Sequence, residues 1–155
     1  FAAHFGLPLG WADFIAQVDG APIVDAYRQQ FRPSARCPEP RVLVCASAVV
    51  ADTDGEAEAI VASVRAWRAA GLRGPIPAGS GGSTPVPLTV RPGRRSIANG
   101  SPGRVAEQLQ GLVDGFGAEE LMVVTICHDH EARVHSYELL AAEFGRDGGT
   151  VEATG

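Results

Sequence analysis

Apolar residues follow two patterns along the chain, and together they predict strands that alternate with helices. Continuous apolar runs, the clearest being Val42–Val50 and Leu121–Ile126, are typical of strands that are covered on both faces. A further run at 7–13, interrupted by Gly and Pro, predicts a third strand. Apolar residues at helical spacing predict helices at 22–32, 54–70, 102–115 and 130–144.

Helix-start signals support these boundaries. Thr53 is followed three residues later by Glu56, which is the spacing of a capping box. Ser101 stands before Pro102, and proline is favoured at the first position of a helix because its missing N–H is no loss there. Asp129 has a side chain that favours the N-cap position and precedes the last predicted helix.

Two segments depart from the strand and helix patterns. Residues 71–99 are rich in Gly, Pro and Ser, which predicts an irregular loop or insertion with at most a short edge strand at Val86–Val90. Residues 145–155 are glycine-rich and are expected to fray. The rest of the chain alternates between strand and helix, which predicts an α/β fold with a parallel sheet and outer helices. This pattern is compatible with a closed barrel and with an open sheet.

Composition narrows the class of protein. The chain has 155 residues, which is enough for a single domain, 1–155, with its own core. Its net charge is −5 and its arginines are scattered, so we expect no nucleic-acid partner. No apolar run is long enough to span a membrane, so we expect no membrane partner. Three cysteines without CxxC spacing predict a reducing, cytoplasmic setting and no disulfide framework.

Three motifs occur in order in the second half of the chain. They are G-S-P-x-x-V-x-x-Q-L at Gly100–Leu109, G-A-x-E-L-M-V at Gly117–Val123 and D-H-E-A-R-x-x-S-Y-E-L-L-A at Asp129–Ala141. The order and spacing resemble the C-terminal end of the luciferase-like flavin monooxygenases. The segment A-D-T-D-x-E-A at Ala51–Ala57 is similar to the same family, as is Y-R-x-x-F-x-P-S, which begins at Tyr27.

The resemblance implies a fold and a chemistry. The fold would be a TIM (β/α)8 barrel, of which this chain would form about strands six to eight, with a missing N-terminal half or a dimer as possible consequences. The chemistry would be oxidation of a small organic substrate by O2 and reduced FMN, or by a deazaflavin in some branches, with a flavin reductase as a further partner. The family's phosphate-binding loop would lie before Phe1.

In a barrel of this kind, functional residues lie in the loops after the strands. Trp11, Asp13 and Phe14 follow or end the first predicted strand, and Cys127 and His128 follow the last. We expect these five residues to line a flavin or substrate pocket. In the family's register, Asp13 and Phe14 replace a Ser and a His, so the polar role of that His is not expected here. The family's polar residues near the flavin ring come from early strands that this chain lacks, so no catalytic residue is assigned.

Other roles for these residues remain open. Cys127, His128 and His130 are types that bind zinc, but consecutive positions at one turn rarely face one ion, and we expect no metal. Cys127 would need a neighbouring base to act as a nucleophile. Trp11 is of a type that often serves as core. Alternatives to the monooxygenase are a non-catalytic α/β remnant or interaction module and a small flavodoxin-like binding domain.

Overall fold

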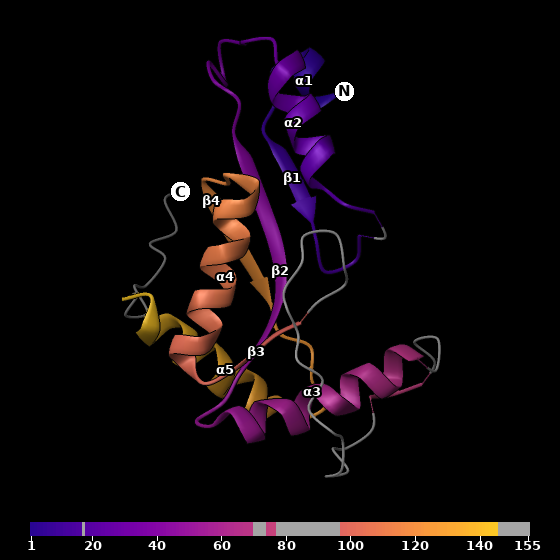
Figure 1. Ribbon diagram of the computed structural model, residues 1–155, viewed down its shortest axis with the longest axis vertical. Helices are drawn as coiled ribbons and strands as arrows, with labels where there is room; N and C mark the ends of the chain where they lie inside the picture. The colour runs from indigo at the N-terminus through magenta and orange to yellow at the C-terminus, as the bar shows by residue number, and fades with distance from the viewer. Residues whose placement is uncertain (17, 70–73, 77–96, 146–155) are drawn as a thin grey trace, which may run out of the picture. The chain divides into compact units, whose positions relative to one another are not determined.

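The computed structural model describes residues 1–16, 18–69, 74–76 and 97–145. The strands predicted at 7–13, 42–50 and 121–126 and the four predicted helices are present, and their ends lie close to the predicted ones (Figure 1). The order of elements along the chain is α1 (Ala2–Phe5), β1 (Leu9–Ala12), α2 (Ala21–Gln30), β2 (Val42–Val50), α3 (Asp54–Ala69), β3 (Ile97–Gly100), α4 (Pro102–Phe116), β4 (Glu120–Val124) and α5 (His130–Glu143).

Internal contacts divide the described chain into two compact units. The first unit holds the described residues of 1–48, 97–98 and 107–126. The second unit holds those of 49–76, 99–106 and 127–145. Both β2 and α4 contribute residues to each unit, so the two units are not separate segments of the sequence. The single domain expected for residues 1–155 stays a prediction.

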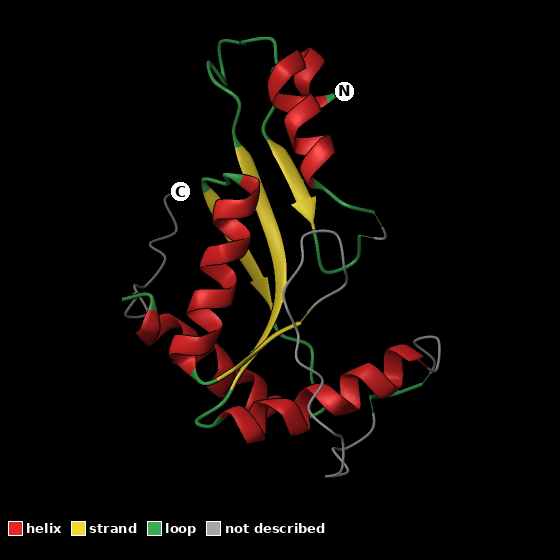
Figure 2. Cartoon of the chain, in the orientation of Figure 1, coloured by secondary structure: helices red, strands yellow, loops and turns green. Residues whose placement is uncertain are grey.

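The sheet is built around β2. Both β1 and β4 pair with β2 in parallel, and the three strands lie side by side in Figure 2. In the β1 pairing Leu9 lies opposite Val42, and in the β4 pairing Glu120 lies opposite Leu43. The parallel orientation is confirmed, as expected where a helix connects successive strands.

The first unit has a core formed by β2, α2 and the second part of α4. Tyr27 on α2 accepts a hydrogen bond from the Arg41 N–H at 3.1 Å, and its hydroxyl lies 3.0 Å from the Leu7 carbonyl oxygen. Arg28 donates to the carbonyl oxygens of Phe116 and Gly117 at 2.7 and 2.6 Å, which connects α2 to the end of α4. The buried apolar residues are Val24, Tyr27, Cys37, Val42, Val44, Ala46, Ala48, Ile97, Ala98, Leu109, Leu112 and Phe116.

The second unit gathers the end of β2, the start of α4, and helices α3 and α5. The Val50 N–H donates to the buried Ser136 hydroxyl of α5 at 2.9 Å. The Ala51 N–H donates to the Gly100 carbonyl oxygen at 3.2 Å. Gly100 has a φ of 141°, a conformation that favours glycine. The buried apolar residues are Val49, Val50, Ala51, Ala57, Val61, Val64, Val105, Cys127 and Leu140.

Two predictions about strands were wrong. Coverage on both faces was expected for Leu121–Ile126, but β4 has exposed Glu120 and Met122, and its other residues are half-buried. Glu120 and Met122 share one face of the sheet with Leu43 and Cys45 of β2, which are also only half-buried, so this face lacks full cover. The predicted irregular segment 71–99 ends in a strand, β3, which adjoins β2. The sequence IANG carries too short an apolar pattern to indicate a strand.

Some predictions lie outside the described residues. They are the edge strand at Val86–Val90, most of the irregular segment 71–99, and nearly all of the frayed tail 145–155. Among the helices that the structure describes, none combines the length and the apolar character needed to cross a membrane.

Candidate functional site

Trp11 lies on β1 in the first unit and has an unusual environment. Its indole nitrogen Nε1 is buried, and it has no hydrogen-bond partner among the described residues. The ring packs against Gly20, where an added Cβ would lie only 2.3 Å from Cε2 of the indole. A buried N–H without an acceptor is costly, so this donor is suited to a polar group that the described chain does not supply.

Asp13 and Phe14 follow β1 in the same unit. Asp13 is only 2% exposed, and its backbone N–H donates to the Cys45 carbonyl oxygen at 3.0 Å, which extends the β1–β2 ladder by one residue. Phe14 is half-buried in the turn that follows. The structure therefore keeps Trp11, Asp13 and Phe14 together at the carboxyl end of one strand.

Cys127 and His128 belong to the second unit, so the five predicted site residues fall into two sets. The Cys127 thiol donates to the Asp129 carbonyl oxygen at 3.1 Å. Burial raises the pKa of this thiol and outweighs the lowering by the charge of Arg133, and the charge of Asp129 adds a smaller raising effect. The thiol is therefore protonated near neutral pH, which argues against a nucleophilic role.

The histidines of this loop contact different groups. His128 Nδ1 lies 2.7 Å from the Ile76 carbonyl oxygen, and His130 Nδ1 lies 2.6 Å from Arg133 Nη2. No group of three or more metal-binding side chains gathers anywhere in the described part of the chain. The arrangement gives no support to the alternative zinc site.

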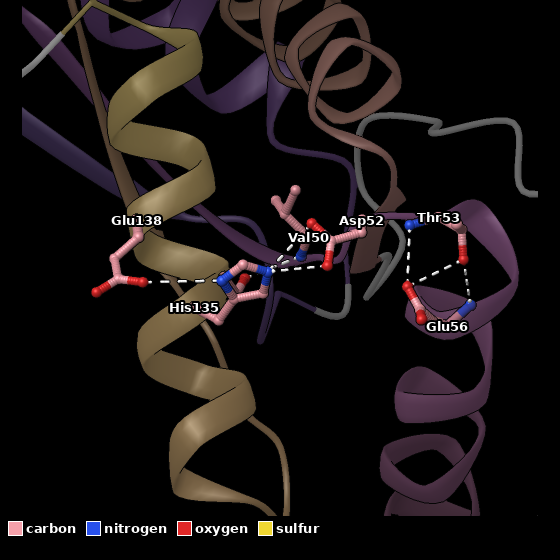
Figure 3. A network of polar contacts seen from close by, with 7 residues as sticks. Val50, Asp52, Thr53, Glu56, His135 and Glu138 are labelled. Carbon is pink, nitrogen blue, oxygen red and sulfur yellow. Dashed lines mark hydrogen bonds and ion pairs between the residues drawn. The ribbon is translucent and has the colours of Figure 1, made fainter.

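A third site, which sequence reasoning missed, lies where β2 ends in the second unit (Figure 3). His135 of α5 places Nε2 3.3 Å from both carboxylate oxygens of Asp52, and its Nδ1 lies 3.7 Å from the Glu138 carboxylate. An open hollow of about 360 Å³ adjoins this pair. Its lining combines the apolar Ala51, Ala59 and Ile60 with the ionisable Asp52, Glu56 and His135.

The chemistry of this hollow follows from its side chains. Both ring nitrogens of His135 face carboxylates, so the imidazole is oriented by them. The Glu56 carboxylate already accepts from the Thr53 N–H at 3.1 Å and from the Thr53 hydroxyl at 3.0 Å. The hollow can therefore accept hydrogen bonds or attract a cation, and it is unsuited to an anion. Nothing in the sequence links position 135 to position 52.

Each of the longer described helices begins at a carboxylate. Asp19 accepts from the Ala21 N–H of α2 at 3.0 Å, and Asp129 accepts from the Ala132 N–H of α5 at 2.7 Å. Glu56 and Thr53 form the predicted capping box of α3, which is confirmed. Asp54 accepts from the Ser101 N–H at 2.7 Å, immediately before α4. These four helix starts therefore carry negative charge.

Comparisons with known proteins place the chain among longer relatives. It is 32% identical over 152 residues to the uncharacterized protein YceB of Bacillus subtilis strain 168, covering 92% of this chain and 46% of that protein. It is 29% identical over 151 residues to a luciferase-like monooxygenase of Escherichia coli K12, covering 89% of this chain and 44% of that one. No family model matches the chain.

A solved structure gives the same picture. The crystal structure of apo-MsnO8 matches with a TM-score of 0.80 and 33% identity, covering 94% of this chain and 47% of that one. The chain thus spans about half the length of the relatives it matches. Its likeness to a luciferase-like monooxygenase extends over most of its own length.

Proposed function

We propose that this chain is a portion of a luciferase-like, flavin-dependent monooxygenase. The single observation that carries the proposal is the similarity to the Escherichia coli luciferase-like monooxygenase over 89% of the chain. The parallel strands β1, β2 and β4, with helices between them, are compatible with strands six to eight of a (β/α)8 barrel. The substrate would be a small organic molecule, and the cofactor reduced FMN or, as the alternative, a deazaflavin.

The carboxyl end of β1 suits the ring system of a flavin. The ring carries carbonyl oxygens and nitrogens that accept hydrogen bonds, and Trp11 offers a buried N–H that lacks an acceptor among the described residues. Trp11, Asp13 and Phe14 are therefore the residues that would contact the ring. Cys127 and His128, in the second unit, stay separate predictions for pocket lining. When bound, reduced flavin would supply the electrons that activate O2.

The helix starts do not suit the flavin phosphate. Phosphates bind at helix N-termini because free N–H groups and the helix dipole favour negative charge. In this chain, the N-termini of α2, α3, α4 and α5 already have Asp19, Glu56, Asp54 and Asp129 beside them, and these carboxylates would repel a phosphate. The phosphate must therefore be held by groups other than these helix starts.

Comparing FMN with riboflavin tests whether this chain contacts the flavin ring but leaves the flavin phosphate to other groups. Because riboflavin lacks the phosphate, the 155-residue chain should bind FMN and riboflavin with similar, weak affinity, measured by flavin fluorescence. Trp11→Phe, which removes the indole N–H and keeps an aromatic ring, should weaken both. If the chain alone bound FMN at micromolar or lower concentration and did not bind riboflavin, it would itself hold the phosphate, which would contradict this proposal.

The monooxygenase itself is tested with a longer chain. Joining the residues that precede the matched region in a relative should give tight FMN binding and O2 consumption that depends on reduced flavin and a flavin reductase. If such a chain folds and does neither, the proposed function is wrong. The second candidate, a non-catalytic α/β module, would then be preferred, since the carboxylates at the helix starts already disfavour a phosphate.

A further inference from the structure

We draw no further inference here: the strongest candidate, the open hollow at the end of β2 that is lined by Asp52, Glu56 and His135, rests on a cluster of acidic side chains around one histidine, and no second observation among the described residues points to a ligand there.

Discussion

The strands β2 and β4 are parallel neighbours with similar apolar sequences, but they are buried to very different degrees. Val44 of β2 is 0% exposed, whereas Met122 of β4 is 55% exposed. β1, β3 and β4 all adjoin β2, but β4 pairs with β2 alone among the described strands. The register places Met122 opposite Cys45, on the other face of the sheet from Val44, and Cys45 is also only half-buried. An apolar run therefore indicates a strand, and the covering of each face of the sheet decides how far its side chains are buried.

The largest expected effect comes from removing apolar volume on the two strands. Val44→Ala should lower the free energy of unfolding by about 2 to 3 kcal/mol, because it removes buried methyl groups and leaves a cavity. Met122→Ala should cost less than about 1 kcal/mol because the side chain is half-exposed. Urea denaturation of the two variants measures both losses of stability. Equal losses would remove the contrast between the strands.

Substitutions at two glycines, one packed against Trp11 of β1 and one in open space, test the packing of β1 in the same way. Gly20→Ala should cost about 2 kcal/mol, because the new methyl group would collide with the rigid indole ring of Trp11. Gly111→Ala is the control, because Gly111 lies within α4 with open space around it. This change should stabilise the chain by about 0.5 to 1 kcal/mol through helix propensity. Thermal unfolding of the two variants should shift in opposite directions, and a neutral Gly20→Ala would contradict the close packing of Trp11.

The helix that follows β4 depends on a single cap. Asp129→Ala should lower the free energy of unfolding by about 1 kcal/mol, because the Ala132 N–H loses its acceptor. Asp129→Asn should cost only about a few tenths of a kcal/mol, since an amide oxygen can also cap. Chemical denaturation compares the two, and similar losses in both would assign the effect to charge and not to capping.

The smallest expected effect is a pH dependence at the start of α4. Hydrogen bonds from the Ser101 N–H and then from Arg104 hold the pKa of Asp54 below its ordinary value of 3.8. Because the folded state lowers this pKa, the stabilisation is complete above 3.8 and is lost as the pH falls through the lowered value. Asp54→Asn should therefore lower stability at neutral pH and flatten its acid dependence below about pH 4. Melting temperatures across this range test the sign, and an unchanged acid dependence in Asp54→Asn would contradict it.

The sequence by itself determined the local structure of this protein. Apolar spacing predicted where β2, β4 and the longer helices lie, and Thr53, Glu56 and Asp129 predicted their caps, because these signals act between residues close in the chain. The parallel direction of the strands also followed, since connections through helices require it.

Only the tertiary structure decided the features that join distant positions. Three features depend on residues far apart in the sequence. They are the contact of His135 with Asp52, the hydrogen bond from the Ser101 N–H to the Asp54 carboxylate, and the exposure of Met122 on one face of the sheet. β3 was also missed, because its four residues form a strand through pairing with β2 and not through their own pattern. Burial and hydrogen bonding between distant segments are set by packing, which local periodicity does not encode.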